Sequence, residues 1–234
     1  MKRNFLLIMI LALVGTFGMS AVNLKGAHYQ GIAKMKGKPI DLWLTLELDD
    51  EDIEVNIGEV SNFASPYTKT ETGNNVTVSF TVPGSPKAVL KSTDGGSSFE
   101  GLISIADIKY DVWVLRVPKK LKPAEQSDEE LSSILASPDG YTAFCVLDNK
   151  DGKASVTCDF SFTPDGKFSL TCDSPSMQDI FTNFKGTYSV NNGEVTLNSV
   201  AGVSFSGPIY DNGNYIKIPV GRKSGMGLTL ILIR

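Results

Sequence analysis

The chain has 234 residues, with 22 lysines and arginines against 26 aspartates and glutamates, so its formal net charge is −4. Loss of Lys2 and Arg3 with a leader would leave 20 − 26 = −6, and so acidic a chain lacks the basic surface that nucleic-acid binding requires. Its 22 glycines and 11 prolines interrupt short apolar runs throughout, which favours many strands over a few long helices.

Residues 1–20 have the pattern of a secretory signal peptide. Lys2 and Arg3 precede an apolar run from Phe5 to Val14, and the small residues around Ser20 predict cleavage after that position. The alternative is a membrane anchor, but the apolar run is shorter than the roughly 18 residues that spanning requires. We therefore expect an exported protein, in the periplasm or outside the cell, that is soluble after signal cleavage.

Residues 21–117 predict a first β domain. Apolar and polar side chains alternate from Ile40 to Leu48, and this period of two is typical of a half-buried strand. The acidic residues Asp49–Asp52 then form a hairpin tip before the next strand. Patterns of this kind, bounded by glycine, proline and asparagine, predict about eight strands. They lie at residues 28–35, 40–48, 53–57, 67–72, 76–82, 88–90, 99–105 and 110–117.

Residues 118–140 differ in character and predict a linker with one short helix. The segment 118–123 is a charged spacer that begins and ends with proline. Ser127 and Glu130 then form a capping box ahead of an apolar helical face. Turn-forming residues at 137–140 end the helix.

Residues 155–173 predict the clearest hairpin of the chain. Thr163-Pro164-Asp165-Gly166 fits a type I turn followed by a bulge, with proline where φ is near −65° and glycine in the left-handed position. The register that follows places Phe162 opposite Phe168, and Cys158 opposite Cys172, all on the core side.

This register predicts a disulfide between Cys158 and Cys172. The two cysteines occupy a non-hydrogen-bonded pair, in which Cα atoms approach to about 4.5 Å, and export allows oxidation. Two alternatives remain open: a pair of reduced thiols packed as small apolar side chains, and a two-residue Asp165-Gly166 turn that would place Cys158 opposite Asp173. Cys145 would be left as a free, buried thiol.

Residues 141–234 repeat the strand patterns and predict a second β domain. Asn192-Gly193 is the signal of a type I′ hairpin turn, and apolar side chains at helical spacing predict a helical turn over residues 176–184. Residues 42–48 align with residues 156–162 at an offset of 156 − 42 = 114, and residues 113–116 with residues 230–233 at 230 − 113 = 117. A duplicated domain is the economical interpretation, and one continuous sandwich is the alternative.

The segments Phe160–Phe168 and Gly186–Leu197 carry a resemblance to a known family. Their turn-and-strand patterns resemble the small calycin-like (lipocalin-like) β-barrel domains exported by Bacteroidetes, over most of residues 141–234 and more faintly over residues 26–117. The resemblance implies an all-β chain of two tandem antiparallel up-and-down barrels, each able to hold one small ligand. It implies no activity and no catalytic motif. The early Gly-x-Trp of the lipocalins proper is absent near Gly31 and Gly152.

Candidate functional residues are few, and none predicts catalysis, a metal site or a cofactor. His28 is the single histidine, and no nucleophile-elbow motif accompanies it. Asp49–Asp52 offers oxygen ligands for calcium but lies at a hairpin tip, where solvated charge is the ordinary finding. Trp43 and Trp113 are expected either to line a ligand cavity or to pack between a barrel and the linker helix.

Four residues are candidates for ligand binding. Phe181 and Phe184 would cap a barrel opening. Arg222 and Lys223 lie in a glycine-rich stretch, predicted to be a loop at residues 221–227, and would meet an anionic ligand at a barrel mouth or form an ordinary solvated loop.

We therefore expect a non-catalytic exported calycin-like protein that binds a small hydrophobic or amphipathic ligand. The alternative is a protein-interaction or structural module of the cell envelope, with an envelope protein as partner and no small-molecule ligand. A barrel interior filled by Leu, Ile and Phe side chains would argue against a carrier, because ligand sites usually need about 300 Å³ or more.

Overall fold

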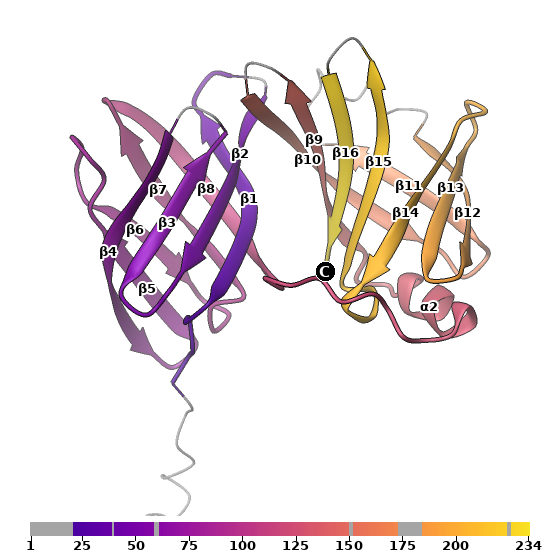
Figure 1. Cartoon of the computed structure of the whole chain (residues 1–234), viewed down its shortest axis with the longest axis horizontal. Coiled ribbons are helices and arrows are strands. Elements are labelled where there is room, and N and C mark those ends of the chain that lie inside the picture. Colours follow the sequence, from indigo (N-terminus) through magenta and orange to yellow (C-terminus); the bar gives the residue numbers. More distant parts are fainter. Residues whose placement is uncertain (1–20, 39, 59–60, 150–151, 173–183, 224–225) are drawn as a thin grey trace, which may run out of the picture.

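The computed structural model describes residues 21–38, 40–58, 61–149, 152–172, 184–223 and 226–234. The predicted signal peptide at residues 1–20 and most of the helical turn predicted at residues 176–184 lie outside this description. The fold is all-β, with a single α-helix among the described residues, and it has two sets of strands side by side (Figure 1).

The first eight strands form a closed antiparallel barrel, which we call the N-terminal barrel. Each strand pairs with the next, and β1 pairs with both β2 and β8, so the barrel has no free edge. The strands are β1 (Ala27–Met35), β2 (Asp41–Leu48), β3 (Asp52–Ile57), β4 (Ser61–Thr72), β5 (Asn75–Phe80), β6 (Ala88–Ser92), β7 (Ser98–Ile105) and β8 (Ile108–Val117).

The other eight strands make up the C-terminal half, residues 141–234. They also pair in chain order, and β16 pairs back onto β9. A short 3₁₀ turn, η1 (Asp211–Gly213), separates β14 from β15. The strands are β9 (Tyr141–Asn149), β10 (Gly152–Phe162), β11 (Lys167–Cys172), β12 (Lys185–Asn191), β13 (Glu194–Ser199), β14 (Ser204–Tyr210), β15 (Tyr215–Lys223) and β16 (Met226–Ile233).

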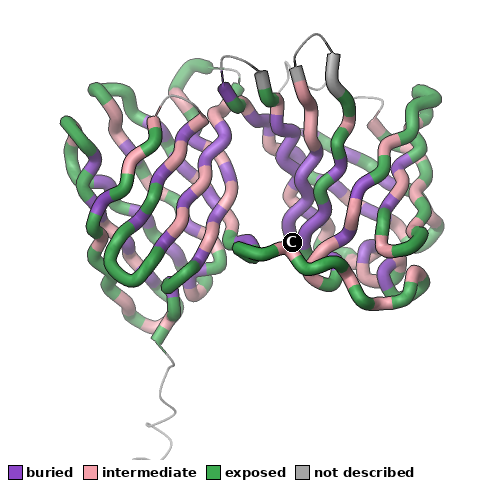
Figure 2. The backbone as a smooth tube through the Cα atoms, viewed as in Figure 1, coloured by how far each residue is buried: buried purple, intermediate pink, exposed green. Residues whose placement is uncertain are grey.

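Buried residues alternate with exposed or half-buried ones along strands of the N-terminal barrel (Figure 2). On β3, for example, Ile53, Val55 and Ile57 are fully buried, whereas the residues between them are exposed or half-buried. One cluster of 21 buried residues fills this interior with Leu, Ile, Val, Phe and Tyr side chains. The alternation predicted from the sequence therefore sets which side of each strand forms the core.

Helix α2 (Asp128–Leu135) is the helix that the capping box predicted. The Ser127 hydroxyl accepts a hydrogen bond from the Glu130 backbone N–H, and the Glu130 carboxylate accepts one from the Ser127 N–H at 3.0 Å. Leu131 and Leu135 are fully buried against the core of the C-terminal half, and the helix lies at one end of that half (Figure 1). The predicted helix is confirmed.

The β10–β11 hairpin has the predicted register. Phe162 pairs with Phe168, Phe160 with Leu170, and Cys158 with Cys172, and Gly166 takes a φ of 76° behind the type I turn. Cys158 and Cys172 form a disulfide with their Cα atoms 4.2 Å apart. Cys145 is a free, buried thiol, and burial raises its pKa to about 12.

Two expectations need correction. The strand predicted at residues 67–72 begins six residues earlier. Ser61–Pro66 pairs with β3, although apolar and polar residue types do not alternate over this segment of the sequence. The predicted glycine-rich loop is the end of a hairpin, in which Arg222 pairs with Gly227 and Lys223 with Met226. The predicted linker is also seen to pack against the C-terminal half, since the Asp211 N–H donates to the Lys122 carbonyl and the Ala124 N–H to the Ile209 carbonyl.

No helix among the described residues is long and apolar enough to cross a membrane.

The two-residue turn of the β7–β8 hairpin offers a test of backbone strain. Ala106 and Asp107 both have positive φ, 48° and 67°, as a type I′ turn requires, but Asn-Gly suits that turn far better. We expect the double substitution Ala106→Asn and Asp107→Gly to raise the free energy of unfolding in urea by about 1 kcal/mol.

The control is the β12–β13 hairpin, in which Asn192 and Gly193 already fill the same positions with φ of 53° and 72°. Replacing them by Ala and Asp should lower the free energy of unfolding by a similar amount. Equal stability of the Ala106→Asn, Asp107→Gly variant and the natural chain would show that the turn is not strained.

Candidate functional site: the junction between the strand sets

The two strand sets meet through a separate cluster of apolar side chains, which we call the junction. Phe144 of β9 is fully buried there, with the ring centroid of Trp43 at 5.4 Å and that of Trp113 at 5.9 Å. The buried members of the cluster are Trp43, Val117, Phe144, Val146, Tyr215, Ile231 and Ile233. The only two tryptophans of the chain therefore pack on one phenylalanine from the other half. Their aromatic partner is thus Phe144 rather than a residue of the linker helix, and neither is among the described residues that line the cavity beside this cluster.

Backbone hydrogen bonds also cross the junction. β2 and β10 pair over two residue pairs, Leu42 with Ala154 and Asp41 with Ser155. Gly58, at the start of the β3–β4 turn, also lies close to β10, since a β-carbon at this position would be 3.2 Å from the Lys153 carbonyl oxygen. These contacts join the strand sets on the same side as the aromatic packing, so the relative position of the two halves is fixed by both kinds of interaction.

A polar network runs beside the aromatic cluster. The Tyr215 hydroxyl donates to Oε1 of Gln30 at 3.1 Å, and Nε2 of Gln30 lies 3.2 Å from Nε2 of His28. Nδ1 of His28 is 3.3 Å from Oε1 of Glu47, an ion-pair distance without the alignment of a hydrogen bond, and Lys119 Nζ is 3.1 Å from the other Glu47 oxygen. Burial raises the pKa of Tyr215 to about 12, so the phenol is a neutral donor at ordinary pH.

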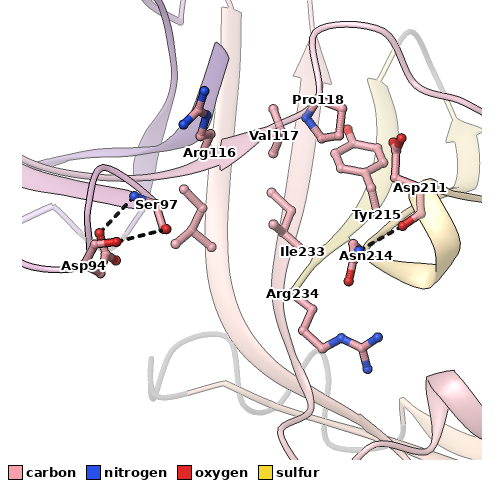
Figure 3. A pocket seen from close by; sticks show the side chains of 11 residues that line it. Asp94, Ser97, Arg116, Val117, Pro118, Asp211, Asn214, Tyr215, Ile233 and Arg234 are labelled. Carbon is pink, nitrogen blue, oxygen red and sulfur yellow. Dashed lines mark hydrogen bonds between the residues drawn. The ribbon is translucent and has the colours of Figure 1, made fainter. Parts of the chain in front are cut away.

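A cavity of about 540 Å³ lies between the two halves next to this cluster (Figure 3). Leu115, Val117 and Ile233 give it a largely apolar floor, and charged side chains stand at its edge. The lining residues are Asp94, Ser97, Leu115, Arg116, Val117, Pro118, Asp211, Asn214, Tyr215, Ile233 and Arg234. Its size is within the range of small-molecule sites, which is about 300 to 1,000 Å³.

Three of the four charged side chains at the cavity have partners outside it. The Arg116 guanidinium donates to the Asn23 carbonyl at 3.2 Å. The Arg234 guanidinium donates to the Ile134 carbonyl at 2.8 Å and lies over the Tyr141 ring, so it is turned toward α2 (Figure 3). The Asp94 carboxylate accepts hydrogen bonds from Ser92, Ser97 and Ser98 of its own loop. The fourth, Asp211, has a buried carboxylate oxygen, Oδ2, without a hydrogen-bond partner.

Of the four ligand-binding candidates from the sequence, only Phe184 has a described side chain. Phe184 packs between Phe168 and Phe205, with ring centroids 5.7 Å away in both cases. Phe181 lies outside the described residues, and for Arg222 and Lys223 only the backbone is described, at the far end of the β15–β16 hairpin. Phe184 is not among the described residues that line the junction cavity. Their predicted role at a barrel mouth stays a prediction.

The acidic hairpin tip carries ordinary surface charge. Asp49, Asp50 and Asp52 are exposed, and Asp50 pairs with Lys25 at 2.6 Å. The residues that the structure describes contain no group of three or more His, Cys, Asp or Glu side chains that could hold a metal ion.

Sequence reasoning missed the cavity residues because they come from four separate segments between residues 94 and 234. One signal was available. At the offset of 117 that aligns the last strands of the two halves, Asp94 aligns with Asp211 (211 − 94 = 117) and Ser97 with Asn214. The cavity is thus bounded by the same loop and the same strand end of each half.

No protein-family model, no curated protein and no solved structure matches the chain. The closed eight-stranded antiparallel barrel is compatible with a calycin-like barrel.

The aromatic packing at Phe144 can be tested by truncation. We expect Phe144→Ala to lower the free energy of unfolding by about 3 to 5 kcal/mol, because the side chain is fully buried and a cavity remains. Emission from the tryptophans should shift to longer wavelength as both indoles lose their cover.

The matched control is Phe63→Ala, at a half-buried position of β4 in the N-terminal barrel whose ring contacts Phe80. It should cost less stability and leave the tryptophan emission unchanged. An unshifted emission spectrum in Phe144→Ala would contradict the packing described here.

His28 makes the junction sensitive to pH. Burial is the main cause that lowers its pKa from the usual 6.5, with Glu47 acting against the shift and Lys119 adding to it. Below about pH 6.5 the unfolded chain therefore binds a proton that the folded protein binds less readily, and stability falls as the pH falls. We expect the melting temperature of the natural chain to drop more between about pH 7.5 and 5.5 than that of His28→Gln. An equal drop in melting temperature for the natural chain and His28→Gln over this pH range would contradict the prediction.

Proposed function

We propose that this chain is a non-catalytic exported protein of two tandem calycin-like barrels, which binds a small hydrophobic or amphipathic molecule at the junction. The single observation that carries the proposal is the cavity of about 540 Å³ with an apolar floor between the halves. A small ligand with an apolar body would cover Leu115, Val117 and Ile233, and the charged edge would meet its polar end.

The tandem arrangement rests on three agreements between the halves. Strand pairing in the C-terminal half returns to its first strand, as it does in the N-terminal barrel. The aligned sequence segments lie in equivalent strands, β2 with β10 and β8 with β16. Buried tyrosines make matching hydrogen bonds, from the Tyr29 hydroxyl to the Gly96 carbonyl and from the Tyr141 hydroxyl to the Gly213 carbonyl, both at 2.7 Å. Duplication of one domain accounts for all three.

The packed interior of the N-terminal barrel directs the ligand to the junction. The largest side chains inside it, including Tyr29, Phe80 and Phe99, are at most 1% exposed. A ligand inside this barrel would have to displace them, at a cost of several kcal/mol. The junction cavity needs no such displacement.

Export and the absence of catalysis are further parts of the proposal. The leader pattern of residues 1–20 supports export, and Lys2, Arg3 and the following apolar run are its signals. Cys145, the free thiol of the chain, is buried, and its pKa is raised to about 12, whereas a nucleophilic thiol needs a lowered pKa.

One observation favours the alternative function, an interaction or structural module of the cell envelope. A groove of about 490 Å³ follows the outer side of β11 and β12, and the exposed Val200 lies at its edge. Val200 is 63% exposed and Val203, on the same turn, is 48% exposed. A partner protein could cover these valines. This alternative predicts no binding of small apolar molecules at the junction.

Leu115 allows the cavity to be closed without disturbing the barrel core. Its side chain lies on the outer face of β8, half-buried, at the floor of the cavity. We expect the neutral dye N-phenyl-1-naphthylamine to bind the natural chain with a rise in fluorescence. Leu115→Trp should weaken this binding at least about tenfold, because the indole fills the floor of the cavity.

The matched control is Leu102→Trp, on the outer face of the neighbouring strand β7 at a side chain that is 40% exposed and does not line the cavity. It should bind the dye as the natural chain does. Absence of binding to the natural chain, or equal binding by both variants, would reject the junction as the ligand site and favour the interaction module.

A further inference from the structure

The segment before β1 lies at one end of the N-terminal barrel (Figure 1). Leu24 is 3% exposed and belongs to the buried cluster that fills this barrel, and Val22 packs against the same cluster. A β-carbon on Gly96 would be 3.1 Å from Cγ1 of Val22 and 3.2 Å from Cδ2 of Leu24. The segment therefore lies tightly on the loop before β7, and we call residues 21–25 the strap.

Two cationic side chains of the barrel hold the strap by its backbone. The Arg116 guanidinium of β8 donates to the Asn23 carbonyl at 3.2 Å. Lys69 Nζ of β4 donates to the Val22 carbonyl. The ends of a folded chain are usually loose unless they are tied down. Contacts to two consecutive carbonyls of so short a segment indicate that the strap has a fixed position on the barrel.

Glu71 of β4 binds the start of the strap. The Val22 N–H donates to both oxygens of its carboxylate, Oε1 at 2.9 Å and Oε2 at 3.1 Å, and Lys69 Nζ donates to Oε2 at 3.1 Å. These bonds, that of Val22 first, hold the pKa of Glu71 below its usual range. Among the described residues Val22 is the single donor to Oε1, which has lone pairs for another. The Glu71 side chain is 20% exposed, so a further donor can reach it.

The backbone nitrogen next to that of Val22 belongs to Ala21, the residue that follows the predicted cleavage site. Successive backbone nitrogens are about 3 to 4 Å apart, and Ala21 is exposed, so its nitrogen can turn toward the Glu71 carboxylate. Hydrolysis of the bond between Ser20 and Ala21 by a leader peptidase consumes one water. At neutral pH it leaves a carboxylate on Ser20 and an ammonium on Ala21. Cleavage therefore creates a cation beside a carboxylate that already holds the neighbouring residue.

We propose that Glu71 binds the ammonium group of Ala21 once the leader has been removed, so that cleavage fastens the strap to the end of the barrel. The precursor has one neutral amide N–H at Ala21, whereas the ammonium has three donors and a full charge. Hydrogen bonds between charged partners are roughly twice as strong as those between neutral ones. The inference rests on the export part of the proposed function, because it needs cleavage after Ser20.

The C-terminal half shows why the strap needs this additional anchor. α2 lies at the lower end of that half in Figure 1, as the strap does in the N-terminal barrel, and its Leu135 is fully buried. Arg234 donates to the Ile134 carbonyl of α2, in the way that Arg116 holds the strap. However, α2 is continuous with the chain on both sides, whereas cleavage leaves the strap with a free end. A free end stays on the barrel only if its own groups are bound.

The pKa of the Ala21 amine is the direct test. The mature chain, which starts at Ala21, is prepared with ¹³C-labelled alanine by exact removal of an N-terminal fusion partner, and the Ala21 methyl signal is followed by NMR as the pH is raised. A neighbouring carboxylate favours the charged form, so we expect the pKa to lie above the usual range of α-amines, about 7.7 to 8.0. Lys69 acts in the opposite direction. Other charged groups line the adjoining pocket: Lys25, Asp49 and Asp50.

Two variants with the same change of charge assign the effect to one carboxylate. In Glu71→Gln the titration midpoint of the Ala21 amine should fall by about one pH unit, into the usual range. Glu54→Gln, at an exposed position of β3, should leave the midpoint where it is in the mature chain. A structural disturbance alone would not separate these two variants in this way.

An extended chain, with Gly-Ser placed before Ala21, provides a second readout. It keeps Glu71 and the other contacts of the strap, but it moves the ammonium two residues away and leaves a neutral amide at Ala21. We expect its melting temperature to be about 2 °C below that of the mature chain, and its own amine to titrate in the usual range. In the Glu71→Gln background the extension should not change the melting temperature, because the partner of the ammonium is already absent.

The outcomes distinguish the role of Glu71 from export itself. An amine pKa within or below the usual range in the mature chain, or equal melting temperatures of the mature and extended chains, would overturn the role of Glu71 and leave export standing. Mass spectrometry of the protein from cells that produce the full chain gives the cleavage site, which we expect after Ser20. Cleavage at another bond would overturn the inference alone, and retention of residues 1–20 would overturn the export proposal together with the inference.

Discussion

Packing of Phe144 between Trp43 and Trp113 is the contact on which the arrangement of the whole chain depends. A closed barrel pairs nearly all of its strand edges with one another, so it has little backbone left to pair with a neighbour. The N-terminal barrel can therefore be fixed to the C-terminal half only through outward-facing side chains and the few backbone contacts between β2 and β10. The aromatic cluster supplies the apolar area for this, and the polar network from Tyr215 to Glu47 gives it a defined orientation. The cavity exists because these contacts hold the strand ends of both halves at a fixed separation.

Comparison of the halves distinguishes what the fold requires from what it does not. The hydrogen bonds of Tyr29 and Tyr141 to loop glycines are the same in length and place, which indicates that this loop needs a buried hydroxyl to hold it against the strands. The serines around Asp94 meet the needs of that aspartate in the N-terminal loop. The C-terminal loop keeps the aspartate, loses the serines and remains folded with Oδ2 of Asp211 unpaired. The same loop position therefore carries an aspartate whose Oδ2 has a hydrogen-bond donor in one half and none in the other.

The sequence predicted the elements best where local chemistry was decisive. Turn chemistry at Thr163–Gly166 fixed the register of the β10–β11 hairpin, including the pair Cys158 and Cys172, and the capping box at Ser127 located α2. Prediction from the sequence failed where contacts between distant segments of the chain determine the structure. Apolar and polar residue types do not alternate over Ser61–Pro66, yet this segment forms a strand because β3 offers hydrogen-bonding partners. The alternation of apolar and polar residues places Trp43 and Trp113 on the outer side of their strands, but it does not show which surface covers them. The cavity could not be predicted as a site, because its residues converge only after both strand sets have formed and docked.

Hydrogen exchange with and without N-phenyl-1-naphthylamine tests most directly the claim that a ligand occupies the junction. The account predicts slower exchange of backbone amides at the end of β8 (residues 115–117) and in the β14–β15 turn (residues 211–215). Amides of the N-terminal barrel core, such as those of Ile53 and Val55, should exchange at the same rate in both conditions, since that interior is already filled. Protection of the barrel-core amides without protection at the junction would contradict the account, because it would place the ligand inside a barrel.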